Sequence, residues 1–206
     1  MSVIDDLKQA VIRGDRAKAK ELAEQARSEG ASARAIVVEG IAPAMAIVGE
    51  KFRANEFFVP ELLIAQRAMK EALGVLAGEV TDHIGTVVIG TVKGDLHDIG
   101  KNLVAAMLEG AGFKVVDLGV DVAPDRFVSA AQESDANVIA MSALLTTTMG
   151  AMKDTVRILG EAGMSGRVRV MIGGAPVTQS YAEEIGADGY APDAASAVST
   201  AKSLSG

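Results

Sequence analysis

The feature that most constrains the fold is a change of periodicity near residue 80. Before it, apolar residues recur at helical spacing, and after it short apolar runs of strand length alternate with helical segments. Alternating strands and helices form a parallel sheet, because each helix carries the chain back so that the next strand runs in the same direction. We therefore predict a helical domain over residues 1–82 and an α/β domain over residues 83–206.

The first domain is predicted to be a four-helix bundle, because four amphipathic segments follow one another with short connections. The expected helices cover residues 2–14, 15–30, 33–55 and 57–78. Asp15 is expected to cap the second helix, Pro43 to kink the third, and Pro60 to occupy the first turn of the fourth.

The second domain is predicted to be a flavodoxin-like, five-stranded parallel sheet with helices on both faces. The expected strands are residues 86–92, 114–120, 137–143, 167–174 and the weaker 188–192. Helices are expected to begin at Asp98, Pro124, Thr148, Thr178 and Ala194. Sheets of this kind bind ligands beyond the carboxyl ends of their strands, so the loops at those ends are the candidate site.

Composition excludes several classes of function. The chain has no cysteine, which removes disulfides, thiolate nucleophiles and iron–sulfur clusters. The net charge is -7 and no basic run occurs, so we expect neither nucleic acid nor an anionic membrane as a partner. The N-terminus is mixed and charged, and no apolar run approaches the roughly 20 residues that span a bilayer. We expect a soluble, cytoplasmic protein.

The segment "GDLHDIGKN", residues 94–102, follows the first expected strand and contains His97, one of only two histidines. Its glycines could suggest a phosphate-binding loop. However, five residues separate Gly94 from Gly100, and Asn102 follows Lys101 where a hydroxyl residue is required. The spacing argues against a nucleotide phosphate.

Two other chemistries compete for His97. A hydrolytic triad could be assembled from Ser142, His97 and Asp95, but no G-x-S-x-G nucleophile turn is present. The second possibility is that His97 ligates a metal, with Asp95 fixing the imidazole tautomer. The second histidine, His83, precedes the first strand and is expected to be a linker residue. One protein histidine suffices as an axial ligand where a macrocycle supplies the other positions.

Three segments of the α/β half resemble a known family. "GDLHDIGKNLV" is similar to the D-x-H-x-x-G signature of cobalamin-binding proteins, with Asp95, His97 and Gly100 at its three positions. "MSALLTTTM" (141–149) resembles the S-x-L element of that family, and "MIGGAPVT" (171–178) resembles its double-glycine element. "GEKFRANEFFVPELLIAQRAMKEAL" resembles the helical cap of methionine synthase and of methyltransferase-associated corrinoid proteins. The resemblance covers nearly the whole chain.

The resemblance implies a cobalamin cofactor bound without its own base, with His97 as the lower cobalt ligand. Asp95 and Thr148 would continue a hydrogen-bond relay from that ligand. Small residues would make room for the nucleotide tail, Tyr190 would line its edge, and Phe58 would cover the upper corrin face. The implied cofactor-binding residues are Gly94, Asp95, Leu96, His97, Asp98, Ile99, Gly100, Ser142, Leu144, Thr146, Thr148, Gly173, Gly174, Tyr190 and Phe58.

The implied function is that of a methyl carrier, a non-catalytic subunit of a methyltransferase system. It would take a methyl group from a substrate-specific methyltransferase and deliver it to a second methyltransferase, whose acceptor is tetrahydrofolate or a thiol coenzyme. A corrinoid-reductive activation protein would be a further partner. A cobalamin-dependent sensor or regulator is the alternative, although the sequence shows no output module. The cobalamin subunit of a carbon-skeleton mutase is less favoured, because such subunits generally lack the helical cap.

Overall fold

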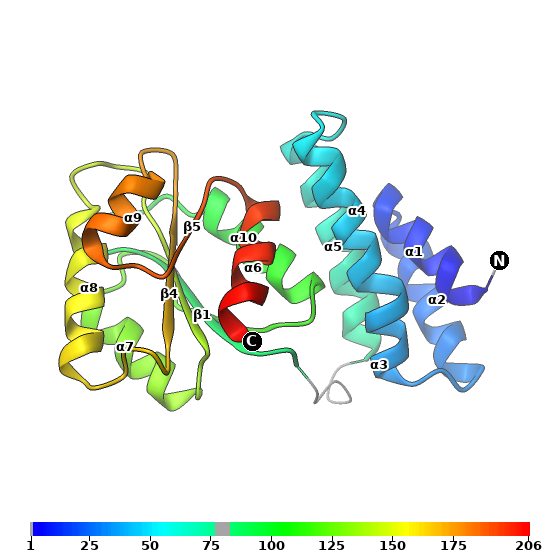
Figure 1. Ribbon diagram of the computed structural model, residues 1–206. Helices are drawn as coiled ribbons and strands as arrows, with labels where there is room; N and C mark the ends of the chain where they lie inside the picture. The colour runs from blue at the N-terminus through cyan, green and yellow to red at the C-terminus, as the bar shows by residue number, and fades with distance from the viewer. Residues whose placement is uncertain (1, 77–82) are drawn as a thin grey trace. The chain divides into compact units, whose positions relative to one another are not determined.

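The computed structural model describes residues 2–76 and 83–206, which form two compact units (Figure 1). The first unit comprises residues up to His83 together with Glu109–Gly112, and the second comprises Ile84–Leu108 and Phe113–Gly206. The predicted boundary at residue 82 lies outside the described residues and stays a prediction.

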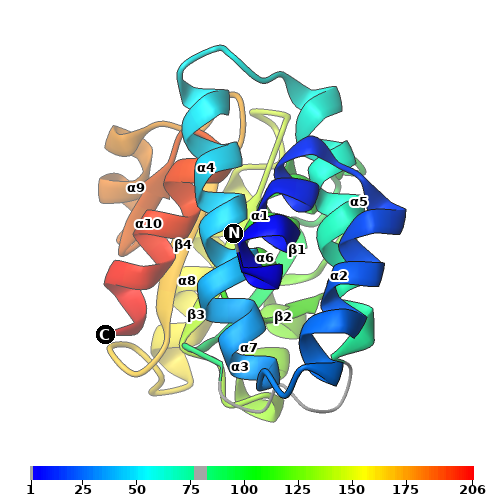
Figure 2. The ribbon, with the colours of Figure 1, turned by 90° about the vertical axis from the view of Figure 1, so that its right-hand side faces the viewer.

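The first unit is helical, as the sequence predicted. Its elements are α1 (Val3–Arg13), α2 (Arg16–Ser28), α3 (Ala33–Ala35), the π-helix η1 (Ile36–Ile41), α4 (Ala42–Arg53) and α5 (Val59–Val75). Helix α2 packs against α1 and α5, and α4 packs against the same two helices, so the four long helices close into a bundle (Figure 2). Their buried faces combine alanine with larger apolar residues such as Leu7, Leu22 and Met69, and the alanines let the helix backbones approach closely.

Local sequence explains where these helices begin. The hydroxyl of Ser2 accepts the backbone N–H of Asp5, and the Asp5 carboxylate accepts the backbone N–H of Ser2, which forms a capping box for α1. Asp15 caps α2 as predicted, by accepting the backbone N–H of Lys18.

The third predicted helix is continuous but not uniform. Pro43 lies in the first turn of α4 and lacks the N–H that would bond to the carbonyl of Glu39. Immediately before it, the N–H of Ala42 donates to the carbonyl of Val37, five residues back, which is the spacing of a π-helix. A π-helical segment thus directly precedes the turn that contains Pro43, and the kink expected at this proline stays a prediction.

The second unit is the predicted five-stranded parallel sheet. Its strands are β1 (Thr86–Thr91), β2 (Lys114–Asp117), β3 (Val138–Ser142), β4 (Arg169–Gly173) and β5 (Gly189–Ala191), in the order β2-β1-β3-β4-β5 with every pair parallel. This order is flavodoxin-like. The helices are α6 (Ile99–Gly110), α7 (Pro124–Glu133), α8 (Gly150–Glu161), α9 (Gln179–Ile185) and α10 (Ala194–Ser205). Figure 1 shows α6 and α10 on one face of the sheet and α7, α8 and α9 on the other.

The centre of the sheet is buried on both faces, which explains why the interior of β1 is largely apolar. Gly90 is an exception in this strand. A Cβ at this position would lie 2.9 Å from the ring of Phe127, which is fully buried against β1, so glycine makes room for the phenyl group. The Phe127 side chain therefore packs α7 against the centre of the sheet.

The strand order creates a switch point between β1 and β3. From β1 the chain crosses to β2 on one side of the sheet, and it later returns to β3 on the other side. The loops that follow β1 and β3 therefore lead to helices on opposite faces of the sheet, and folds of this kind bind ligands beyond the carboxyl ends of those strands. One prediction was wrong in its detail here. Strand β2 ends at Asp117 rather than at Val120, because residues 118–121 turn into a loop in which Gly119 and Asp121 have positive φ.

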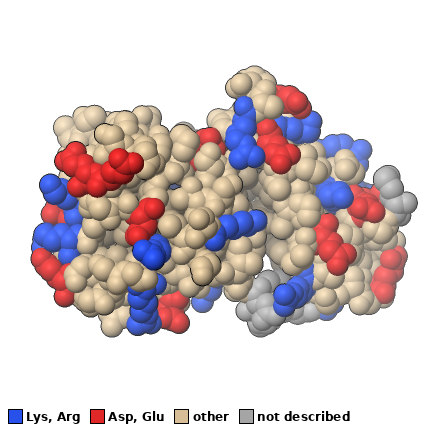
Figure 3. All heavy atoms as spheres, viewed as in Figure 1, with Lys and Arg blue, Asp and Glu red and all other residues tan. Residues whose placement is uncertain are grey.

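Charged side chains of both signs are interspersed on the face shown in Figure 3. Ion pairs at the surface of the described residues include Arg126–Glu133 and Arg169–Asp188. Exposed pairs of this kind contribute about 1 kcal/mol or less, so the apolar cores hold the fold. Across the described residues, we find no helix with the length and apolar character needed to cross a membrane.

Candidate functional site

The three segments singled out in the α/β half meet at one edge of the sheet. In the strand register, Thr91 at the end of β1 pairs with Ser142 at the end of β3, and Ser142 pairs with Gly173 at the end of β4. Residues 92–98 and 143–149 leave this edge side by side. The segments of the sequence that contain the histidine, the serine and the double glycine are thus brought together by strand order.

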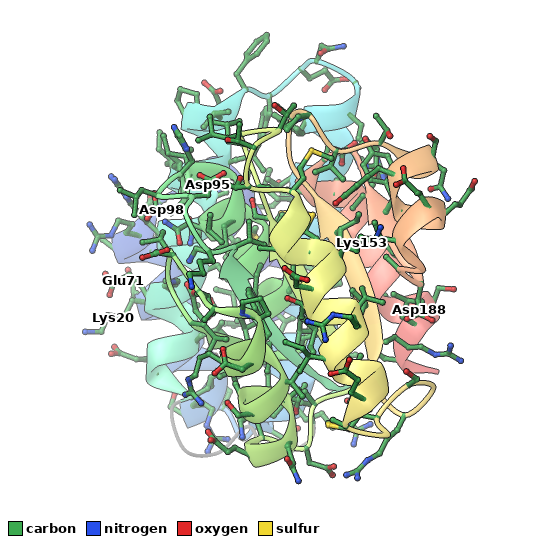
Figure 4. All side chains as sticks on the ribbon, turned by 90° about the vertical axis from the view of Figure 1, so that its left-hand side faces the viewer. Lys20, Glu71, Asp95, Asp98, Lys153 and Asp188 are labelled. Carbon is green, nitrogen blue, oxygen red and sulfur yellow. The ribbon has the colours of Figure 1, made fainter. Side chains whose placement is uncertain are left out.

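The centre of this edge is the carboxylate of Asp95, which is 0% exposed. One oxygen, Oδ1, accepts the backbone N–H of His97 at 3.0 Å and lies 2.7 Å from Nδ1 of the same residue. The other, Oδ2, accepts the backbone N–H groups of Leu144 at 2.7 Å and Leu145 at 3.2 Å. The hydroxyl of Thr148 lies 3.1 Å from Oδ2. Figure 4 shows Asp95 and Asp98 together at one end of the α/β unit.

These contacts determine the charge of Asp95. Burial by itself would raise the pKa of the carboxyl group, but the hydrogen bonds from the Leu144 amide, from His97 and from the Leu145 amide outweigh it. The pKa of Asp95 consequently lies far below its ordinary value. At neutral pH the group is a carboxylate that can only accept hydrogen bonds.

The ionised carboxylate also sets the tautomer of His97. Nδ1 faces an atom that can only accept, so Nδ1 carries the proton and Nε2 keeps its lone pair. The imidazole is 52% exposed, and so Nε2 is accessible to a Lewis acid. A carboxylate on the far nitrogen holds such an imidazole in one orientation.

Thr148 reaches the same carboxylate from the loop after β3. Its hydroxyl oxygen is 3.1 Å from Asp95 Oδ2 and 2.8 Å from the carbonyl oxygen of Leu145. A hydroxyl has one proton to donate, so the two acceptors compete for it. The chain of contacts from His97 through Asp95 to Thr148 is present, and its role in a relay stays a prediction.

Other predicted site residues surround this group. Gly94 has φ +84°, which favours glycine, and Leu96 and Ile99 are each 71% exposed. Asp98 accepts a hydrogen bond from the side-chain amide of Asn102, one turn along α6. At Gly100, a Cβ would have no neighbour within 4 Å, so the packing of the chain does not require glycine there.

At Gly173 and Gly174, by contrast, an added Cβ would lie too close to backbone atoms. Gly174 has φ +128°, and a Cβ there would lie 1.9 Å from the carbonyl oxygen of Ala143. A Cβ at Gly173 would lie 2.9 Å from the carbonyl oxygen of Ala191. Both glycines are therefore demanded by backbone-to-backbone approach within the sheet edge, whatever ligand the site holds. The resemblance assigned both glycines to the path of the nucleotide tail, and the structure adds this requirement within the chain itself.

The remaining predicted residues are more dispersed. Ser142 is half-buried at the end of β3, Thr146 is exposed in the loop after it, and Tyr190 is half-buried in β5. Phe58 belongs to the helical unit, where it precedes the first turn of α5 and is 60% exposed.

The structure adds residues that the sequence did not single out. Val120 and Leu145 are exposed apolar side chains, and they join Leu96 and Leu144 in the loops that follow β1, β2 and β3 and Ile99 at the start of α6. Exposed apolar side chains gathered at one edge indicate a ligand or partner surface. Their signal in the sequence was weak, because a leucine or valine beside a strand is normally part of the core.

Two polar residues were also missed. Thr91 is fully buried and donates its hydroxyl to the carbonyl of His97 at 2.9 Å. Asp121 accepts the backbone N–H of Gly94 at 2.7 Å. Both hold the main chain around His97, and both lie outside the three recognised segments.

The donor set at this edge fits a metal that already carries most of its ligands. Within residues 2–76 and 83–206, no group of three or more His, Cys, Asp or Glu side chains could hold a metal ion. His97 supplies one neutral nitrogen of fixed orientation, which is what the axial position of a macrocycle-bound metal requires. The open space at Gly100 and the exposed apolar side chains suit a large, largely apolar ligand.

A flavodoxin-like unit that presents an imidazole on a buried carboxylate, preceded by a helical unit, defines a B12-binding protein. Residues 85–199 match the family described as B12 binding domain, and residues 3–77 match a second family of the same description. The chain therefore belongs to the B12-binding family, and within it to the corrinoid proteins that are homologous to the methylamine corrinoid proteins.

Three comparisons carry this assignment. The chain is 40% identical to a corrinoid protein of Desulfitobacterium hafniense, covering 100% of this chain and 99% of that protein. It is 44% identical to dimethylamine corrinoid protein 2 of Methanosarcina acetivorans, covering 91% and 85% of the two chains. It also resembles a chain in the crystal structure of the methanol:cobalamin methyltransferase complex MtaBC from Methanosarcina barkeri, with a TM-score of 0.88 and 29% identity over 98% of this chain and 79% of that one.

Proposed function

We propose that this chain is a cytoplasmic methyl carrier that binds a corrinoid with Nε2 of His97 as the lower axial ligand of cobalt. The observation that carries the proposal is the 2.7 Å contact between His97 Nδ1 and the buried, ionised Asp95. It leaves one accessible nitrogen lone pair, of fixed direction, at the edge of the sheet where such folds bind ligands.

When bound, the corrinoid supplies a cobalt centre that takes up a methyl group and gives it away. The residues of the chain hold and tune it. Asp95 keeps the proton on Nδ1 and thereby leaves the lone pair of Nε2 available to the metal. Thr148 can donate to Oδ2 and so adjust how strongly Asp95 accepts from His97.

The exposed apolar side chains are assigned to the corrin. Leu96 and Ile99 flank His97 in the chain, and Leu144 follows β3 beside it, so together they provide an apolar seat around the imidazole. Gly100 leaves room, and Ser142, Gly173, Gly174, Thr146 and Tyr190 are proposed to line the path of the nucleotide tail. Phe58 is proposed to shield the opposite face of the corrin from water.

The relatives support one of the proposed partners. Dimethylamine corrinoid proteins and the methanol:cobalamin methyltransferase complex support a substrate-specific methyltransferase that loads this chain. We further propose a second methyltransferase, with tetrahydrofolate or a thiol coenzyme as acceptor, and a reductive activation protein. The methyl donor belongs to the loading enzyme, and methylamines and methanol are the first donors to test.

The test is reconstitution with cobalamin under reducing, anaerobic conditions. The loaded protein should be methylated by a methylamine or methanol methyltransferase in the presence of its substrate, and it should lose the methyl group to an acceptor methyltransferase. In the cobalt(II) state, histidine labelled with ¹⁵N should alter the superhyperfine splitting. His97→Ala should keep the corrinoid but lose this isotope effect. A wild-type spectrum without nitrogen coupling from histidine would rule out the proposed ligand.

A further inference from the structure

The loop after β2 lies against the segment that carries Asp95 and His97. The N–H of Thr91 donates to the carbonyl of Gly119 at 2.9 Å, and the N–H of Val122 donates to the carbonyl of Thr91 at 3.0 Å. These bonds prolong the contact between the two segments beyond the end of β2, where regular pairing has stopped.

Asp121 makes two further bonds from this loop. Its carboxylate oxygen Oδ1 accepts the N–H of Gly94 at 2.7 Å, and its own N–H donates to the carbonyl of Asp95 at 3.0 Å. One residue therefore brackets the two-residue segment Gly94–Asp95, taking its N–H at one end and its carbonyl at the other. No other described residue bonds to both ends of this segment.

The backbone of Asp121 is unusual. Its φ is +54°, in the left-handed region, which few residues other than glycine adopt without strain. Aspartate and asparagine tolerate this region better than other side chains. Strain of this kind persists where the surroundings enforce it, and here it accompanies two bonds to the same neighbouring segment.

We propose that Asp121 is a positioning residue for His97. By fixing the main chain on both sides of Asp95, it fixes the buried carboxylate, and the carboxylate in turn fixes the imidazole through Nδ1. The proposal rests on the proposed function in one respect, which is that the imidazole so held is the ligand of the corrinoid cobalt. The loop after β2 thereby joins the loop after β3 as a second segment that holds Asp95 and His97 in place.

Two substitutions distinguish the role of the Asp121 carboxylate from the role of its backbone conformation. Asp121→Gly removes Oδ1 while favouring positive φ, so the loop keeps its path and the protein keeps its fold. Asp121→Asn keeps a side-chain oxygen for the Gly94 N–H and tolerates the same φ. If the carboxylate oxygen positions His97, glycine should impair the site and asparagine should restore it.

Asp135 offers a matched control. It has φ +50° and accepts a hydrogen bond from Arg167, but it lies between α7 and β3, at the amino ends of the strands. Asp135→Gly makes the same chemical change far from His97. It should leave the His97 site as in the wild type.

The first readout uses the protein without cofactor. Hydrogen exchange of the His97 backbone amide, which donates to Asp95 Oδ1, should become roughly two- to tenfold faster in Asp121→Gly, as expected for the loss of one exposed hydrogen bond. The Nδ1 proton of His97 should broaden or disappear in the same NMR samples. Asp121→Asn and Asp135→Gly should match the wild type.

The second readout uses cobalamin-loaded protein. The share of cobalt(II) that shows nitrogen coupling from histidine should fall in Asp121→Gly and return in Asp121→Asn. If Asp121→Gly retains the wild-type share, the positioning role is overturned whatever the exchange rates show. If the wild type itself shows no histidine coupling, the proposed ligand fails. The exchange rates then decide by themselves whether Asp121 positions the imidazole.

Discussion

Leu144 N–H donates to Oδ2 of Asp95 over 2.7 Å, although 49 residues separate the two in the chain. This bond ties the loop after β3 to the loop after β1, across the switch point of the sheet. It belongs to a set of contacts that keeps Asp95 ionised, fixes the tautomer of His97, and so prepares one nitrogen for a ligand. Predictions follow for each part of this arrangement.

Asp95→Asn should destabilise the protein even without cofactor. The amide replaces one carboxylate oxygen by an NH₂ group, which cannot accept the hydrogen bonds that now converge on both oxygens. We expect a loss of about 1.5–3 kcal/mol in the free energy of unfolding, measured by urea titration. His97→Ala is the control, because it removes one partner of Asp95 and leaves the backbone donors in place. If Asp95→Asn and the wild type had the same free energy of unfolding, the hydrogen bonds to Asp95 would not stabilise the protein as proposed.

The stability should depend on pH through Asp95. Its pKa in the folded protein lies below the ordinary value of 3.8, so the unfolded chain takes up this proton first as the pH falls. The stabilising contribution is complete above the unfolded pKa and declines as the pH drops from about 5 downwards. Urea titrations between neutral and acidic pH should show this decline, with a shallower slope in Asp95→Asn. Parallel slopes in the two proteins would assign the acid sensitivity to other carboxyl groups.

Thr148→Val and Thr148→Ser test the hydroxyl on Oδ2. Valine keeps the shape but removes the O–H, whereas serine keeps the donor. Because backbone amides still hold Asp95, valine should cost only about 0.5–1.5 kcal/mol in the free energy of unfolding. It should, however, slow methyl transfer in the reconstituted system, and serine should restore the rate. A valine variant with the wild-type rate would show that Thr148 plays no part in the relay.

Gly174→Ala and Gly100→Ala form a pair with opposite expectations. At Gly174, with φ +128°, the added Cβ would overlap the Ala143 carbonyl, so we expect a loss of more than about 2 kcal/mol in the free energy of unfolding. At Gly100, in the first turn of α6, nothing lies within 4 Å of an added Cβ. Alanine there should leave the stability unchanged or raise it by about 0.5–1 kcal/mol.

The variant Gly100→Ala also tests where the corrinoid binds. If the space beside Gly100 receives the corrinoid, Gly100→Ala should weaken cobalamin binding although the protein is as stable as the wild type. Binding is measured by retention of cobalamin on gel filtration and by equilibrium titration. Undiminished binding by Gly100→Ala would place the corrinoid elsewhere along this edge.

Much of the fold could be read from the pattern of apolar residues. The change of period near residue 80, the five strands and the cap at Asp15 depend on residues close together in the chain, and the structure confirms the helical unit and the parallel sheet. The π-helix before Pro43 could not be predicted, because π and α segments share nearly the same side-chain pattern. The early end of β2 was missed because Leu118 and Val120 continue its apolar run.

The sequence by itself determined the pair at the heart of the site, since Asp95 and His97 are two residues apart and their contact needs only one local turn. Tertiary structure decided what surrounds that pair, and of these neighbours the resemblance had implied only Thr148. The amides of Leu144 and Leu145, the hydroxyl of Thr148 and the bracket made by Asp121 arrive from 26 to 53 residues away. Their arrival depends on β1 lying between β2 and β3, and that order is set by packing of the whole sheet and its helices, which no local pattern of side chains encodes.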